Sequence, residues 1–386
     1  MTGTEATPRR LMDELAVIAA RGLAEMADGD TGLFPHKVVL TPAGTATGAP
    51  NPFYSAISVI GLVTGGVDDV WRERVRLGTA TDALVAACAA SGARNGMLVG
   101  TATSALALAG DARATDLVGG LDRDWTPAGR SSMEIGLVVS GLVAAMERQP
   151  ACRDRAARLA AAGARELMAR WSSASGLFDG RRRLRRPRDV RPSSLLSRNL
   201  TSFAHQVYAV HGLAEHARVV SGRVPDCAVR TADRLVQEQG PLGQWWWIHS
   251  ARDGRVIDGY PVYSVHQDAM AFLALAPLEN LGAGRYAEAL WRGLRWVDGA
   301  NELQESLVHR DRNLIVRCIQ RVGSDADGPS GLSRPAIRAA RLASWGLRPA
   351  AGTRAEPSGL EILSECRSYH LGWLLYARSL VSGWSD

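Results

Sequence analysis

Gln239-Gly240-Pro241-Leu242-Gly243-Gln244-Trp245 follows a helical segment and turns the chain at a glycine that an aromatic residue follows closely. A similar arrangement occurs at Gly32-Leu33-Phe34 and at Gly176-Leu177-Phe178, each after a helical segment and before a polar turn. A helix–turn–helix unit that recurs in this way predicts helical hairpins stacked on one another. These turns favour a ring or a solenoid built of helix pairs.

Apolar residues follow helical spacing through most of the chain. Strand-like alternation is limited to residues 37–40 and 314–318, which suit the edges of short hairpins. The pattern predicts an all-α fold, a single (α/α)6-type toroid of helical hairpins with short β-hairpin loops, in one domain over residues 1–386. An open α-solenoid is the alternative. The expected helices are residues 11–26, 81–90, 95–109, 132–146, 156–171, 200–217, 225–239, 265–278, 285–297, 333–345 and 366–381.

The composition is that of a folded globular protein. Of 386 residues, 46% are hydrophobic and 22% are charged, which excludes wholesale disorder. Residues 1–23 contain three carboxylates and lack the apolar core of a signal peptide. Residues 96–110 are short for a membrane span. The five cysteines lie far apart, which argues against a disulfide framework, so we expect a cytoplasmic protein without a transmembrane segment.

Basic residues are concentrated in residues 179–198, an Arg/Pro-rich loop within the domain. The whole chain has a formal charge of +6, and Lys37 is its single lysine. A loop of this kind either holds an anionic partner or is simply solvated. It contains no aromatic residue on which a base could stack, so we expect no nucleic-acid partner.

Residues 239–245 fit the pattern Gln-x-x-x-Gly-x-Trp and resemble the QW motif of squalene and hopene cyclases, which are α/α toroids. In that family the glutamine caps a helix end and stacks on the tryptophan, so the resemblance implies structural roles for Gln239 and Trp245. The acidic Asp-x-Asp-Asp motif of those cyclases is approached only by Asp122-Arg123-Asp124-Trp125. The resemblance therefore bears on the fold more than on the chemistry.

Other α/α toroids act on carbohydrates, and the chain is similar to them in general layout and residue types. They include uronate lyases, unsaturated glucuronyl hydrolases and sugar epimerases, whose clefts place His, Tyr, Asn and Arg around a sugar ring. The resemblance implies an enzyme with an aromatic-lined cleft at one end of the ring.

Residues 245–268 form the stretch that is densest in aromatic and titratable side chains. Three consecutive tryptophans point in different directions, so at least one should line a cavity rather than a core. A tryptophan face suits the apolar side of a sugar ring, and it equally suits a prenyl chain or a carbocation. We therefore expect Trp245, Trp246, Trp247 and His249 to bind substrate.

Candidate catalytic residues follow the tryptophans. His266 titrates near neutral pH and could act as an acid or a base. Tyr260 or Tyr263 could give or take a second proton. Asp268 or Asp258 could orient His266, or act as a general acid if its surroundings are dry.

Two further clusters supply candidate substrate-binding residues. Arg367, Tyr369 and His370 open the last apolar helix, which packs next to the first helix in a closed ring. Asn199 and Gln206 are two helical turns apart and share a face, from which they could bind hydroxyl or carboxylate groups. Histidines and cysteines lack metal-ligand spacing, so we expect no metal site and no cofactor.

Together these residues predict a carbohydrate-active enzyme of lyase, epimerase or glycoside hydrolase type. Its substrate would be a small molecule or oligosaccharide with a possibly anionic sugar. One alternative is a terpenoid cyclase-like enzyme that acts on an isoprenoid, with Asp124 or Asp258 as its acid. The other is a non-catalytic glycan-binding or scaffold protein.

Overall fold

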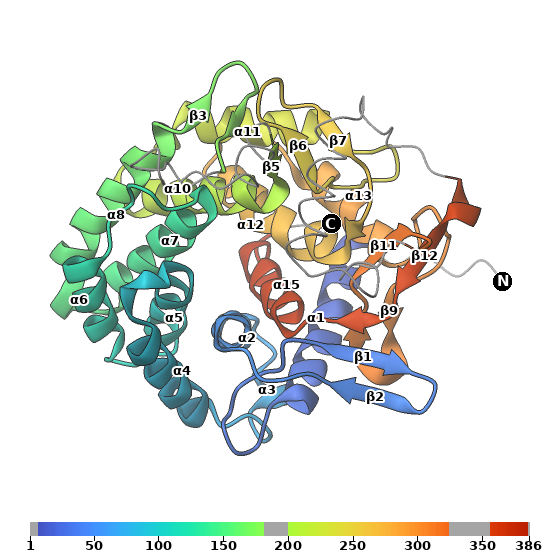
Figure 1. Cartoon of the computed structure of the whole chain (residues 1–386), viewed down its shortest axis with the longest axis horizontal. Helices are drawn as coiled ribbons and strands as arrows, with labels where there is room; N and C mark the ends of the chain where they lie inside the picture. Colours follow the sequence, from blue (N-terminus) through green and yellow to red (C-terminus); the bar gives the residue numbers. More distant parts are fainter. Residues whose placement is uncertain (1–6, 181–199, 324–355, 385–386) are drawn as a thin grey trace.

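In the computed structural model, which describes residues 7–180, 200–323 and 356–384, helices form two concentric rings (Figure 1). Each helix of the outer ring is followed in the chain by a helix of the inner ring. The outer helices are α1 (Pro8–Met26), α4 (Leu77–Ser91), α6 (Ala114–Asp124), α8 (Arg153–Met168), α11 (Asp226–Gln237) and α13 (Ala287–Val297). The inner helices are α2 (Pro52–Thr64), α5 (Gly96–Leu108), α7 (Ser132–Arg148), α10 (Phe203–Val220), α12 (Ala271–Asn280) and α15 (Ser368–Leu380).

The inner ring is closed. Each inner helix packs against the next one along the chain, and α15 packs against α2. One π-helical turn, η4 (His266–Met270), leads directly into α12 and also contacts α15. The α/α toroid predicted from the sequence is therefore confirmed.

Glycines allow the inner helices to approach one another closely. A Cβ added at Gly136 of α7 would overlap the backbone carbonyl of Tyr208 in α10. Facing glycines make similar backbone contacts at three interfaces of the ring. These pairs are Gly61 with Gly372, Gly100 with Gly141, and Gly136 with Gly212.

Burial patterns separate the two rings. In α5 nearly every residue is buried, because this helix has neighbours on all sides. In α11 the buried residues lie on one face, as expected for an outer helix whose opposite face is in solvent. Although the inner helices are apolar, none of the helices described combines the length and the apolarity that crossing a membrane requires.

Short antiparallel strands precede several inner helices, so they gather at the end of the ring where those helices begin. One sheet has the order β13 (Glu365–Cys366), β1 (Val38–Thr41), β2 (Gly44–Thr47). A second has the order β12 (Leu360–Leu363), β11 (Cys318–Arg321), β8 (Val262–Tyr263). A third has the order β5 (Leu200–Ser202), β6 (Ile248–Ser250), β7 (Val256–Asp258). Two-stranded hairpins are β3 (Trp171–Ser172) with β4 (Leu177–Phe178), and β9 (Val308–His309) with β10 (Leu314–Ile315).

The structure differs from the sequence-based expectations in several elements. Helices α2 and α6 were not predicted, although the side chain of Asn51 caps α2 and Pro52 starts it. Residues 314–318 hold two strands rather than one, and residues 200–202 form a strand before α10 begins. The helix expected at residues 333–345 lies outside the described residues.

The glutamine of the QW-like stretch links two outer helices. The Gln239 amide donates hydrogen bonds to the carbonyls of Gly243 and of Ala289 in α13, at 3.0 and 2.9 Å. Trp245 packs on Phe203, with 5.8 Å between ring centroids. These contacts join neighbouring hairpins, while the likeness to cyclases stays a prediction.

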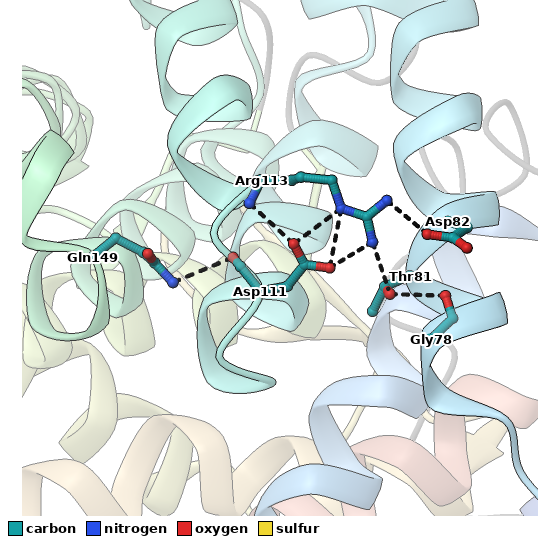
Figure 2. A network of polar contacts seen from close by, with 6 residues as sticks. All are labelled: Gly78, Thr81, Asp82, Asp111, Arg113 and Gln149. Carbon is teal, nitrogen blue, oxygen red and sulfur yellow. Dashed lines mark hydrogen bonds and ion pairs between the residues drawn. The ribbon is translucent and has the colours of Figure 1, made fainter.

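A polar network ties neighbouring hairpins at the end of the ring where the inner helices finish (Figure 2). Arg113 pairs with Asp111 and with Asp82 of α4, each at 2.6 Å. The Gln149 side chain, just after α7, donates to the carbonyl of Asp111 at 3.2 Å. Because Arg113 is substantially exposed, each ion pair contributes little to stability, about 0–1 kcal/mol.

We expect Gly136→Ala to destabilise the protein by about 1–3 kcal/mol or more, since α7 and α10 would have to move apart. The matched control is Gly120→Ala in α6, where an added Cβ meets nothing within 4 Å. It should be neutral or stabilise by up to about 1 kcal/mol through helix propensity. Urea unfolding measures both, and equal effects would contradict the packing described here.

Candidate functional site

The first turns of four inner-ring segments meet at one end of the toroid. Tyr54 of α2 contacts Tyr369 of α15, with ring centroids 4.5 Å apart. Phe203 of α10 contacts His266 of η4 in the same way, at 4.8 Å. Helix N-termini carry partial positive charge, so this end of the ring favours negatively charged groups.

A buried Asp–His pair lies at this end. The Nε2 atom of His370 is 2.8 Å from both carboxylate oxygens of Asp268. The two side chains are 0% and 2% exposed for Asp268 and His370 respectively. Burial raises the pKa of Asp268 above its ordinary value, although the charge and hydrogen bond of His370 act in the opposite direction. At 2.8 Å a proton lies between the imidazole and the carboxylate, and this hydrogen bond fixes both side chains.

Three cations surround a single carboxylate beside this pair. Glu365 of β13 accepts hydrogen bonds from Arg317 at 2.6 Å and from Arg367 at 2.9 Å. Lys37 lies 3.4 Å from the second oxygen of Glu365. Burial opposes ionisation of Glu365, yet the charges of Arg317 and Arg367 hold its pKa below the usual value. This set of contacts carries three positive charges against one negative charge.

His36 joins the cationic group to the aromatic residues. The Arg367 Nη1 atom lies 2.8 and 2.6 Å from the two ring nitrogens of His36. The His36 ring stacks on Tyr54 at 5.1 Å. Burial, and then the charge of Arg367, lower the pKa of His36, so this imidazole is neutral at pH 7.

His266 lies in an aromatic enclosure. Its ring contacts Tyr263 at 5.2 Å, and its Nδ1 atom is buried without a hydrogen-bond partner. Burial lowers the pKa of His266 to about 3. Arg317 lies over the Tyr263 ring at 5.1 Å, and its own Nε atom also lacks a partner. Unsatisfied buried donors of this kind are uncommon and often mark functional sites.

The structure corrects the predicted partner of His266. Asp268 was predicted to orient His266, but its hydrogen bond goes to His370. Ring closure brings α15 against η4, and this packing places His370 rather than His266 beside the carboxylate. Asp258 accepts from the backbone of Tyr260 and lies 3.7 Å from Arg321, so it does not orient His266 either.

The three tryptophans occupy different surroundings. Trp245 and Trp246 are 1% and 3% exposed and belong to the hydrophobic core. Trp247 is half-buried, and its ring meets Tyr263 edge-on at 5.3 Å. His249 is buried on β6, and burial lowers its pKa to about 4. Among these residues, Trp247 has the position best suited to contact a ligand.

Other predicted residues form local contacts. The Tyr260 hydroxyl donates to Glu302 at 2.7 Å. The Gln206 amide donates to the Phe178 carbonyl at 3.0 Å and accepts from the Phe178 N–H at 2.7 Å, which fastens β4 to α10. Asn199 lies outside the described residues, as does the Arg/Pro-rich loop from residue 181 onward.

Several residues of the site are absent from those predicted above, among them Tyr54, Arg317 and Glu365. Tyr54 could have been found, because Asn51 and Pro52 mark a helix start just before it. Arg317 lies in the strand-like stretch of residues 314–318, and Glu365 lies in the two-residue strand β13, but no local pattern marks either side chain as part of a site.

A separate cavity of about 80 Å³ lies between the inner helices, lined by residues nearer their C-terminal ends. Arg218 bridges Glu147 and Glu215 there, at 2.7 and 2.8 Å. The buried Thr101 hydroxyl in its wall has no hydrogen-bond partner. This volume is well below the roughly 300 Å³ at which small-molecule pockets begin, so it suits several waters rather than a sugar ring. None of the predicted site residues lines it.

In residues 7–180, 200–323 and 356–384, no three His, Cys, Asp or Glu side chains gather as a metal site would require.

The sequence matches no protein-family model and no curated protein. Solved structures are similar in fold. A UGL variant described with dGlcA-Glc-Rha-Glc has a TM-score of 0.57 at 15% identity, over 96% of this chain and 95% of that chain. A glycosyl hydrolase family 88 protein from Bacteroides vulgatus has a TM-score of 0.53 at 11% identity, over 96% and 99%. A mutant unsaturated glucuronyl hydrolase from Streptococcus agalactiae has a TM-score of 0.52 at 11% identity, over 98% and 92%.

The two carboxylates of the site should respond to pH with opposite signs. Because the folded pKa of Asp268 is raised above 3.8, the stability it contributes is lost as pH rises through that folded pKa. The unfolding free energy of the wild type should therefore fall relative to Asp268→Asn as pH rises from about 4.

Glu365→Gln is the matched comparison. The folded pKa of Glu365 lies below 4.5, so its contribution is present above pH 4.5 and is lost as pH falls through the folded pKa. Urea unfolding at a series of pH values measures both differences. If the difference in unfolding free energy between wild type and variant changed with pH in the same direction for both variants, the opposite pKa shifts of Asp268 and Glu365 would be contradicted.

Proposed function

We propose that the protein is a carbohydrate-active enzyme of hydrolase type that acts on an anionic sugar. The observation that carries the proposal is the buried Asp268–His370 pair next to the cationic group around Glu365. Its place at the start of the inner helices, on a fold shared with glycosidases, supports the proposal. The low sequence identities establish that shared fold, and the chemistry is argued from the residues.

The pair supplies acid–base chemistry. A carboxylic acid whose pKa is raised by burial keeps its proton closer to neutral pH, as a general acid must. In hydrolysis the proton passes from the Asp268–His370 pair to the oxygen of the bond that breaks. The pair then removes a proton from the attacking water, whose oxygen joins the sugar carbon. One water is consumed, and the pair returns to its starting state.

The charges of the site fit an anionic substrate. Arg317 has an unpartnered Nε atom, so its forked guanidinium can turn toward a substrate carboxylate, while Arg367 is held by Glu365 and His36 and adds positive charge. Glu365 accepts hydrogen bonds from both guanidinium groups while leaving positive charge in excess. The converging helix N-termini add to this potential. The half-buried Trp247 offers an aromatic surface for the apolar side of a sugar ring.

A lyase or epimerase mechanism that uses His266 as the base has less support. Abstraction of a proton from carbon needs a base whose pKa lies near the working pH. Burial holds the pKa of His266 at about 3, so its neutral ring is a weak base. Hydrolysis through Asp268 and His370 makes no demand on His266.

Two of the carboxylates considered for isoprenoid chemistry lie in an unsuitable place. Asp122 and Asp124 are exposed in the last turn of the outer helix α6, and Asp122 pairs with Arg155 and Arg158. Protonation of an alkene needs an acid in a dry chamber, which an exposed outer helix does not provide.

The test is an assay of the full chain with three sets of oligosaccharides of matched length. They end in an unsaturated uronate, a saturated uronate or a neutral sugar. We expect new reducing ends from a uronate set and none from the neutral set. Methyl esterification of the uronate should abolish turnover, because it removes the charge that the arginines bind.

We expect Asp268→Asn to lower kcat by at least about 100-fold, the contribution of a general acid. Asp124→Asn, on the exposed face of α6, is the control and should leave kcat unchanged. Circular dichroism verifies that both variants fold. Undiminished turnover by Asp268→Asn, or a rise in ultraviolet absorbance from unsaturated product, would contradict the proposal.

A further inference from the structure

A groove of about 360 Å³ lies between the hairpin β3–β4 and helix α11. Trp171 of β3 and Arg230 of α11 line it, together with the polar side chains of Ser173, Asp233 and Gln237. A volume of this size is ordinary for a site that binds a small molecule, where pockets reach about 300–1,000 Å³. It is distinct from the Asp268–His370 site and from the cavity between the inner helices.

Hydrogen bonds through Thr231 fix the tryptophan of the groove. Its indole N–H donates to the Thr231 hydroxyl at 3.2 Å, and Thr231 is fully buried. The Thr231 hydroxyl donates in turn to the carbonyl of Gly176 in the hairpin turn, at 2.9 Å. The Trp171 ring is therefore a fixed surface with little entropy left to lose when a ligand binds.

A cation lies above this surface. The Arg230 guanidinium is 5.8 Å from the centroid of the Trp171 ring, and the side chain is exposed. Within the described part of the chain, Arg230 forms no ion pair. The neighbouring Arg234, by contrast, is paired with Glu238 at 2.6 Å and donates to the Asp253 carbonyl at 3.2 Å. Arg230 is thus the cation of the groove that is available to a ligand.

Acceptors complete the groove. Asp233 is exposed, and its Oδ1 atom accepts from the Tyr286 hydroxyl at 3.0 Å, which fixes the carboxylate. Gln237 is one turn further along α11 and is also exposed. A fixed aromatic ring, one guanidinium, one carboxylate and one amide match a sugar unit with hydroxyls and a carboxylate.

The groove lies at the same end of the toroid as the candidate site. Phe178 pairs with Trp171 across the hairpin, and its backbone is hydrogen-bonded to Gln206 in the first turn of α10. The β6–β7 turn also reaches the groove, because a Cβ at Gly254 would collide with the carbonyl of Ser175. The strand β6 that leads into this turn carries His249.

We infer that this groove is a second binding subsite, which takes a uronate unit of an acidic oligosaccharide whose end occupies the Asp268–His370 site. The inference rests on the proposed function. Arg230 binds the carboxylate, Trp171 contacts the apolar face of the ring, and Asp233 and Gln237 bind hydroxyls. Such a subsite makes longer acidic chains better substrates than disaccharides.

The test compares Arg230→Ala with the wild type on acidic oligosaccharides of increasing length. We expect KM to rise about tenfold for long chains, with kcat unchanged and with disaccharide kinetics unchanged. Arg230→Lys keeps the positive charge but lacks the planar guanidinium that forms two parallel hydrogen bonds. Its KM should lie between those of the wild type and Arg230→Ala. Arg223→Ala, an exposed arginine in the turn before α11 and outside the groove, should match the wild type. An equal KM for Arg230→Ala at every length would overturn the subsite.

Calorimetric titration separates failure of the subsite from failure of the proposed function. Long acidic oligosaccharides are titrated into Asp268→Asn and into Asp268→Asn combined with Arg230→Ala. Binding that weakens about tenfold only in the double variant supports the groove, even if no substrate is turned over. Equal binding by both variants rejects the groove, even if hydrolysis is observed.

Discussion

Backbone contact between facing glycines of the inner helices is the constraint on which the rest of the structure depends. Where Gly136 of α7 meets α10, and where Gly61 of α2 meets Gly372 of α15, no side chain separates the two backbones. Contacts this close let the ring shut with its helices parallel, so their first turns meet at one end (Figure 1). Without that closure, Asp268 and His370 would not touch.

The electrostatics of the site follow from this convergence. A carboxylate placed in the dry centre of the ring must either hold a proton or find a cation. Asp268 is hydrogen-bonded to His370, and burial raises the pKa of Asp268. Glu365 has two arginines, and its pKa is lowered instead. Two carboxylates on neighbouring strands and helices thus have opposite proton affinities, which is the arrangement that acid–base catalysis requires.

Sequence patterns predicted the elements better than the contacts between them. Helical periodicity and glycine turns were enough for the toroid, because each hairpin is a local unit. Apolar periodicity did not predict helix α2, because its residues are buried on nearly all sides and show no polar face. Six of the predicted site residues do gather at one end of the ring: Tyr263, His266, Asp268, Arg367, Tyr369 and His370. The Asp268–His370 contact spans 102 residues and exists only because the ring closes, so no local pattern reveals it. Trp245 and Trp246 were expected to bind substrate, yet both rings are buried in the hydrophobic core, where Trp245 contacts Phe203 and Trp246 contacts Tyr260.

The most direct test of the central claim is a crystal structure of Asp268→Asn soaked with a uronate-terminated disaccharide. Our account predicts the sugar at the start of the inner helices. Its carboxylate should lie within hydrogen-bond distance of Arg317, and its glycosidic oxygen should lie near His370. A sugar bound only among the C-terminal ends of the inner helices, beside Arg218 and Tyr376, would contradict the account.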